Sequence, residues 1–192
     1  MPGETAEGES AVINDLDKTL DALLKRDLPS GTVSFDPPDG KFAPSLPCTD
    51  LFLYDVRENR DLRVNERVVE RVTAGKVTTR RPPVRIDCSY LITAWASDAQ
   101  NEHLLLSRVI KILLRYPALP EEVLQGSLVG QDLPLPTAAI QPSLLQSMGE
   151  FWQAMGGRPK AAVSYTVTIA MPVFEPVDTP KVVERITTVR QI

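Results

Sequence analysis

Two segments of this chain alternate apolar and polar side chains, and they restrict the fold more than any other feature. They are residues 84–94 and residues 163–171. Successive side chains of a β-strand point to opposite faces, so the alternation predicts two long strands, each with one buried face. A sheet that is apolar on one face requires a second layer to cover it. The sequence therefore predicts a layered domain built around these two strands.

Amphipathic helices can supply the covering layer. Residues 10–26 place leucines at helical spacing, and residues 104–115 are apolar over a wide arc. A capping box that begins at Ser97 precedes the second of these helices. Another capping box, at Ser147, predicts a short helix over residues 149–155. Three helices are therefore expected to accompany the sheet.

A third strand is predicted at residues 51–56, LFLYDV, which are apolar on both faces except for Asp55. A strand that is apolar on both faces is typical of the centre of a sheet. Val33 and Phe35 indicate a short strand before it. The expected fold is α/β (α+β): a single domain with a mixed, largely antiparallel twisted sheet packed by helices.

Composition indicates one soluble domain and excludes several classes of protein. The chain has 192 residues, of which 43% are hydrophobic and 24% charged, and its formal net charge is -4. That length favours one domain. No apolar run approaches the roughly 18 residues of a membrane span, and the acidic N-terminus has neither the basic nor the apolar part of a signal peptide. We therefore expect synthesis in the cytoplasm and no membrane insertion.

The residues that usually carry chemistry are few. Cys48 and Cys88 lack the spacing of a metal site, and His103 is the one histidine of the chain. No phosphate-binding loop, dinucleotide-binding fingerprint or nucleophile elbow occurs in the sequence. We assign no catalytic, cofactor-binding or metal-ligating residue. Two enzymatic alternatives stay open: Cys88 with His103, and the carboxylate pair Asp55 and Asp87.

Residues 57–86 form the most basic part of the chain, with nine basic and four acidic side chains and a local net charge of +5. β-Branched residues around Ala74-Gly75 predict a hairpin with arms Arg63–Val72 and Lys76–Arg81. So many charged side chains cannot be buried, so the hairpin is expected to project. Its interleaved acids and few aromatic residues argue against a nucleic-acid surface, although an accessory nucleic-acid-binding role stays open. Four arginines are the expected anchors of a protein contact: Arg57, Arg63, Arg67 and Arg71.

Proline is the unusual component, with 17 residues. Pro172, Pro176 and Pro180 predict a semi-rigid linker after the last long strand. Residues 182–190, VVERITTVR, then have a strand-like composition with no partner left in the sequence, so we expect them to pair with another chain. The predicted organisation is a disordered segment 1–9, a domain 10–172, and a linker and β-arm 173–192. The expected contact residues of the arm are Val182, Val183, Ile186 and Val189.

The chain resembles the cap, or tail-terminator, family of extracellular contractile injection systems, which are phage-tail-like particles. The resemblance covers residues 11–171, and the segments LLRYPALP and GEFWQAMGGRPK are its most distinctive parts. The segments that carry it are AVINDLDKTLDALL (11–24), VSFDPP (33–38), LFLYDVRENRDLR (51–63), DCSYLITAWA (87–96), EHLLLSRVIKILLRYPALP (102–120) and GEFWQAMGGRPKAAVSYTVTIAM (149–171).

This resemblance implies a structural protein with an α/β terminator domain related to those of phage tails. It implies a homo-oligomer, a hexameric ring that sits on the baseplate-distal end of the inner tube and contacts the last ring of sheath protein. Such a ring ends tube growth and anchors the sheath, without cofactor or nucleic acid. The particle is assembled in the cytoplasm, and the sequence leaves open whether it is released from the cell. Some members carry a further C-terminal domain, whose role is not carried over to this chain.

Overall fold

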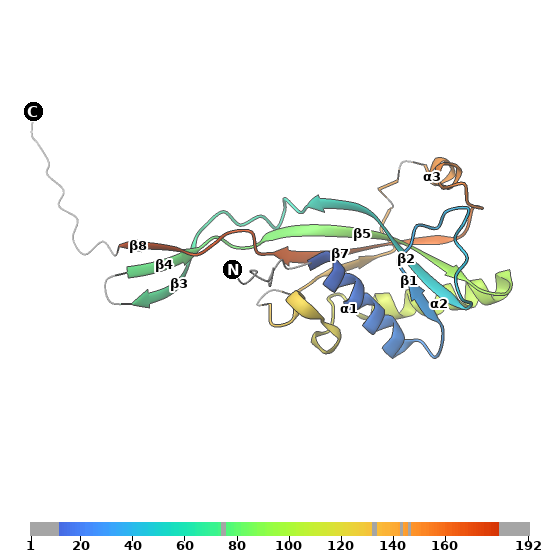
Figure 1. Ribbon diagram of the computed structural model, residues 1–192, viewed down its shortest axis with the longest axis horizontal. Helices are drawn as coiled ribbons and strands as arrows, with labels where there is room; N and C mark the ends of the chain where they lie inside the picture. The colour runs from blue at the N-terminus through green and yellow to red at the C-terminus, as the bar shows by residue number, and fades with distance from the viewer. Residues whose placement is uncertain (1–11, 74–75, 132–133, 143, 146, 181–192) are drawn as a thin grey trace, which may run out of the picture.

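The computed structural model of the chain describes residues 12–73, 76–131, 134–142, 144–145 and 147–180. These residues form two sheets, one of five strands and one of three. The five-stranded sheet lies in the body of the molecule, whereas the three-stranded sheet stands clear of the body at one end (Figure 1). The described part of the molecule is therefore elongated, with the two sheets following one another along its long axis.

The body sheet has the strand order β1-β2-β5-β7-β6. β1 runs parallel to β2, and the other neighbouring pairs are antiparallel. β5 and β7 are the two strands predicted from alternation, and they pair directly, with Val84 opposite Met171 and Thr93 opposite Ala162. The expected mixed, largely antiparallel sheet is confirmed. Its strands are β1 (Thr32–Ser34), β2 (Cys48–Glu58), β5 (Val84–Trp95), β6 (Thr137–Ala139) and β7 (Ala162–Met171).

Two helices, α1 (Val12–Asp27) and α2 (Ala99–Arg115), cover one face of the body sheet (Figure 1). Their apolar stripes meet the apolar face of the sheet, so the predicted layer arrangement is confirmed. The Tyr90 hydroxyl of β5 donates to the Asp17 carboxylate of α1 at 2.8 Å, which gives this buried polar group a partner. Side chains that form the core include Leu16, Leu20, Leu23, Val109, Ile112, Cys88, Ile92, Val167 and Ile169.

The third helix, α3 (Met148–Met155), lies on the other side of the body sheet, at one end of it (Figure 1). The Ser147 side chain accepts from the Glu150 backbone N–H at 3.2 Å, as the capping box predicts. The capping prediction at the second helix was off by one residue. Asp98, not Ser97, is the N-cap of α2, and its carboxylate accepts from the Asn101 backbone N–H at 2.9 Å.

Residues 51–56 were predicted to form a central strand, and the strand that contains them lies between β1 and β5 in the body sheet, although it pairs on both sides over only part of its length. They lie in β2, but β1 pairs with this strand only as far as Asp50. From Leu51 onward β5 is the one neighbour of β2 within the body sheet. The apolar side chain of Phe52 is covered by α3 and not by a second neighbouring strand. Its ring packs near the Phe151 ring of α3, with 6.1 Å between the ring centroids.

The second sheet, which we call the projecting sheet, consists of β3 (Val68–Thr73), β4 (Lys76–Arg80) and β8 (Val177–Pro180), in the order β3-β4-β8. β3 and β4 are the predicted hairpin, although the first arm begins at Val68 and not at Arg63. β8 was not expected, because its residues fall in the proline-rich segment interpreted as a linker. It runs antiparallel to β4, with Val177 opposite Thr79.

The projecting sheet continues the pairing of β5 with β7 after an interruption. β4 leads into β5 through Arg81–Pro83, and β7 leads into β8 through residues 172–176. Both connections contain two prolines, Pro82 and Pro83 in one and Pro172 and Pro176 in the other. Proline has no backbone N–H to donate, so a ladder cannot run unbroken through these residues. The prolines thus separate the two sheets at a joint.

Two short 3-10 turns follow α2, η1 (Glu121–Val123) and η2 (Gly126–Leu128), and hydrogen bonds hold the start of α1 against η2. The Asp15 carboxylate accepts from both the backbone N–H and the hydroxyl of Ser127, each at 2.9 Å. These bonds, with the nearby ammonium of Lys18, lower the pKa of Asp15 to about 2. Gly126 has φ +54°, and a Cβ built on it would lie 2.3 Å from the Asp15 carboxylate.

Replacing Gly126 with Ala should therefore destabilise the fold more than replacing Gly130 with Ala. Gly130 also has a positive φ, +74°, but nothing lies within 4 Å of its added Cβ. We expect Gly130→Ala to lower the free energy of unfolding by about 1–2 kcal/mol, because its positive φ strains an L side chain. Gly126→Ala should cost about 1–3 kcal/mol more, because it also displaces the Asp15 carboxylate from Ser127. Urea unfolding of both variants measures this difference. Equal losses in the free energy of unfolding would contradict a stabilising role for the contact between Asp15 and Ser127.

Candidate assembly interface

The projecting sheet exposes apolar side chains on both of its faces. Val68 and Val69 are adjacent in β3, so they point to opposite faces, and they are 58% and 57% exposed. Val177 of β8 is 47% exposed. Among the described residues no helix or second sheet covers either face (Figure 1). A sheet usually buries one face against a second layer, so this sheet is suited to contact with another protein.

Arg57 and Arg63, two of the predicted anchors, form ion pairs within the chain. The Arg57 guanidinium donates twice to the Asp55 carboxylate, at 2.6 and 2.8 Å, and Arg63 pairs with Glu58. Each arginine lowers the pKa of its carboxylate partner. Because these side chains are largely exposed, their pairs contribute little to stability. The pairs instead fix the direction of the two guanidinium groups beside the connection to β3.

The other two predicted anchors lie at β3. Arg67 is exposed directly before the strand, and it makes no ion pair with the described side chains. The backbone of Arg71 lies in β3 opposite Thr78. The structure thus spreads the four arginines from the end of β2 to β3, and does not gather them at one point. The arm residues expected to form contacts lie outside the described residues: Val182, Val183, Ile186 and Val189.

The structure does not bring Cys88 and His103 together. Cys88 is fully buried in β5, and its burial raises the pKa of the thiol to about 12. A nucleophilic cysteine requires an accessible, low-pKa thiolate, which this position disfavours. His103 is exposed near the start of α2, where it lines a hollow with Trp95 and Lys160.

Asp55 and Asp87 are also held by structural contacts. Asp55 is bound by Arg57, and Arg57 lies directly opposite Asp87 in the register of β2 with β5. Asp87 accepts from the Thr168 hydroxyl at 2.6 Å and from the Asn59 amide at 3.1 Å. Asp55 is thus held by a salt bridge with its arginine and Asp87 by hydrogen bonds from Thr168 and Asn59.

One buried titratable group was missed by the sequence reasoning. Asp50 of β2 is fully buried, and its Oδ1 has no hydrogen-bond partner among the described residues. Its Oδ2 lies 3.5 Å from the Thr93 hydroxyl. Burial raises the pKa of Asp50 to about 7, partly opposed by the hydroxyls of Ser34 and Thr93. Its position directly before the apolar run that starts at Leu51 was the available signal.

No group of three or more His, Cys, Asp or Glu side chains in the described part of the chain is placed to hold a metal ion. None of the described helices combines the length and apolar character needed to cross a membrane. The features that distinguish the described surface are thus the projecting sheet and the charged residues that lead into it.

A model of the Pvc16 N-terminal domain matches residues 15–185. The chain belongs to this family. The matched range includes the body sheet, α1 from Asp15 onward, α2, and all three strands of the projecting sheet. The projecting sheet is therefore part of the region that the family model describes. No curated protein matches the chain.

Two solved structures share the fold. One is the PVC sheath/tube terminator of an extracellular contractile injection system in the extended state, with a TM-score of 0.71 and 29% identity over 96% of this chain. The other is the tube-terminating cap of the anti-feeding prophage, with a TM-score of 0.53 and 28% identity over 94% of this chain. This chain spans 65% and 58% of those two chains, respectively. The resemblance to cap and terminator proteins and the expected fold are both confirmed.

Replacing Asp50 with Asn should make the stability of the chain less dependent on pH. The ordinary pKa of this carboxyl is 3.8 and its pKa in the fold is about 7, so the folded state holds the proton more tightly. The stability that this proton provides is complete below about pH 4 and is lost as the pH rises to about 7. At about 1.4 kcal/mol per pKa unit, the loss amounts to a few kcal/mol.

Urea unfolding across this pH range measures the effect. The native chain should lose stability relative to Asp50→Asn between about pH 4 and pH 7, and the difference should level off above pH 7. Asp55→Asn is a control, because Asp55 is a partly exposed carboxyl whose pKa is lowered by Arg57. Parallel pH profiles of the native and Asp50→Asn chains would contradict the buried position of this group.

Proposed function

We propose that this chain is a structural cap of a contractile injection system. It forms a ring on the baseplate-distal end of the inner tube, ends polymerisation of tube and sheath, and anchors the last sheath ring. The observation that carries this proposal is the similarity of nearly the whole chain to a sheath/tube terminator, at 29% identity and a TM-score of 0.71. The second similar structure is a tube-terminating cap, which points to the same role.

The proposed role is structural and not enzymatic, with no cofactor. The partners are other copies of the chain in a hexameric ring, the inner tube protein and the sheath protein. A ring requires each copy to present two different surfaces to its neighbours, one on each side. The projecting sheet can serve as one of them, since Val68 and Val69 expose both of its faces. The protein is made and assembled in the cytoplasm, as part of a particle that belongs to an extracellular class.

Two regions are proposed to make the contacts. The proposed anchors lie along the route from β2 to β3 and contact acidic groups of the tube or of a neighbouring copy: Arg57, Arg63, Arg67 and Arg71. Arg57 and Arg63 make this contact in addition to their ion pairs with Asp55 and Glu58. Residues 181–190 follow β8 and supply a further strand to an open sheet edge in the sheath or in a neighbouring cap subunit. The arm contact is made by Val182, Val183, Ile186 and Val189.

Substituting lysine for both Val68 and Val69 should prevent capping without unfolding the chain. Both side chains are more than half exposed, so the free energy of unfolding should change by no more than about 0.5 kcal/mol. In an interface the two lysines would be buried without partners, which opposes association. Electron microscopy of particles assembled with this variant should show tubes without caps and with a wider distribution of lengths.

Leu114→Lys is the matched control for this experiment. Leu114 is 57% exposed, as Val69 is, but it lies near the end of α2 and outside the projecting sheet. Particles with this variant should be capped normally. Normal capping by the double valine variant would remove the projecting sheet from the proposed interface.

Deleting residues 181–192 should weaken attachment of the sheath while leaving both sheets folded. The deletion begins after Pro180, so β8 and its pairing with β4 are retained. If the arm adds a strand to the sheath or to the next cap subunit, the truncated protein should still be recovered folded. Its particles should lose the cap or the last sheath ring during purification. Capped particles of unchanged stability would refute the role of the arm.

A further inference from the structure

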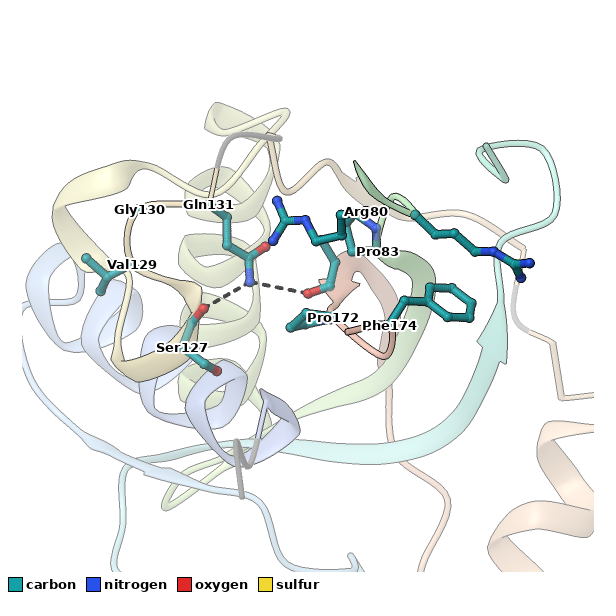
Figure 2. Close-up of a pocket in the computed structure, with 10 residues that line it drawn as sticks. Arg80, Pro83, Ser127, Val129, Gly130, Gln131, Pro172 and Phe174 are labelled. Atoms are coloured by element: carbon teal, nitrogen blue, oxygen red, sulfur yellow. Dashed lines mark hydrogen bonds between the residues drawn. The ribbon is translucent and has the colours of Figure 1, made fainter. Parts of the chain in front are cut away.

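A cavity of about 300 Å³ opens at the joint between the body and the projecting sheet (Figure 2). Its walls come from three segments that are distant in sequence. Arg80 and Arg81 lie at the end of β4, Phe174 lies in the connection to β8, and Val129 and Gln131 follow η2. An occupant of this cavity would therefore touch the body and both connections to the projecting sheet at once.

The chemistry of the cavity favours an acidic, extended peptide. None of the side chains that line it carries a carboxylate, whereas two carry a guanidinium. The Arg81 guanidinium lies 5.3 Å from the centroid of the Phe174 ring. Stacking on a ring occupies the face of a guanidinium and leaves the N–H groups at its edge directed outward, where they can bind carboxylates. Such an arrangement selects negative charge beside apolar surface.

The Gln131 side chain requires an occupant of the cavity that can donate a hydrogen bond. Its amide nitrogen donates to the backbone carbonyls of Ser127 and Ala170, at 3.0 and 3.3 Å (Figure 2). These two bonds orient the side chain, and its Oε1 is buried without a partner among the described residues. A buried acceptor of this kind is costly unless it receives a donor. The backbone N–H of an incoming peptide can supply that donor.

The chain itself contains an acidic segment that precedes α1, and the start of α1 lies beside this cavity. Ser127, one of the lining residues, is bonded to Asp15, three residues after the start of α1 at Val12. Residues 1–11 precede that point and contain Glu4, Glu7 and Glu9 but no lysine or arginine. Eleven extended residues span up to about 36 Å, which is ample to reach the cavity walls.

We propose that residues 1–11 dock in this cavity of their own chain, with their glutamates against Arg80 and Arg81. The docked segment ties the body to both connections of the projecting sheet and restricts the angle at which that sheet leaves the body. This contact is internal to one chain and needs neither tube nor sheath. The docking proposal can therefore be tested, and rejected, independently of the proposed capping function.

A cysteine pair tests the docking in the full-length chain. Thr5→Cys places one thiol in the acidic segment, and Val129→Cys places the other on the cavity wall, where the native side chain is 62% exposed. The native cysteines, Cys48 and Cys88, are buried and do not compete. With oxidised glutathione as the oxidant, the readout is the rate at which the monomer forms an internal disulfide, followed by mass spectrometry.

Two sets of substitutions distinguish docking of the acidic segment from disulfide formation that results only from its proximity to the cavity. Glu4, Glu7 and Glu9 are changed to Gln in one variant, and Arg80 and Arg81 are changed to Gln in another. Each should slow disulfide formation about five- to tenfold, because each removes the charge pairing that raises the local concentration of the segment at the cavity. Arg108→Gln, at an exposed arginine of α2 away from the cavity, should leave the rate unchanged.

Equal rates in all of these variants would overturn the proposal, because nearness alone would then explain the disulfide. Disulfide-linked dimers as the main product would also overturn it, since they would place the segment on a second copy. The glutamate variant alters only residues outside the described fold, so it keeps the test valid even if the arginine variant folds poorly.

Discussion

The pairing of β5 with β7 is the interaction on which the rest of this structure depends. Both strands are long, and they run side by side from Val84 opposite Met171 to Thr93 opposite Ala162. β2 and β6 add to the two outer sides of this pair, and α1 and α2 cover its apolar face. The projecting sheet continues the same two chain directions after a proline-containing joint. An error in the β5–β7 register would therefore displace both sheets, since a shift of one residue reverses the face of every side chain.

The parts of the fold that could be predicted are those in which a local pattern and the tertiary contact agree. β5 and β7 alternate because one face packs apolar side chains against α1 and α2, and α1 carries leucines at helical spacing for the same reason. The expectation of a single buried face was wrong, because the other face, which carries hydroxyl groups such as those of Ser89 and Thr168, is also largely buried. β8 could not be predicted, because its residues were classified by their prolines. Pro180 stands at the end of the strand, and β8 has β4 on one side and no strand of the described residues on the other. Proline is tolerated in such an edge position, so its presence did not exclude a strand.

In the candidate interface, the exposure of charged residues could be predicted from the sequence, but their partners could not. The many charged side chains of residues 57–86 correctly indicated that the hairpin projects, whereas Arg85, in the same range, is buried in β5 of the body sheet. The sequence could not show that Arg57 and Arg63 are held by Asp55 and Glu58, because ion pairing depends on where strands and loops bring the carboxylates. It also could not identify Asp50 as buried. That position becomes interior only because the short strand β1 pairs with β2 up to Asp50.

The projecting sheet links folding to assembly through its exposed apolar surface. A small sheet without a covering layer is marginally stable in water, because its backbone hydrogen bonds form while its apolar side chains remain hydrated. Any partner that buries Val68 or Val69 therefore stabilises the sheet as it binds. The two connections at the joint carry four of the prolines, which limits how far the sheet can move before a partner arrives. Such restriction lowers the entropy that binding must overcome, so the same prolines that interrupt the ladder also prepare the sheet for contact.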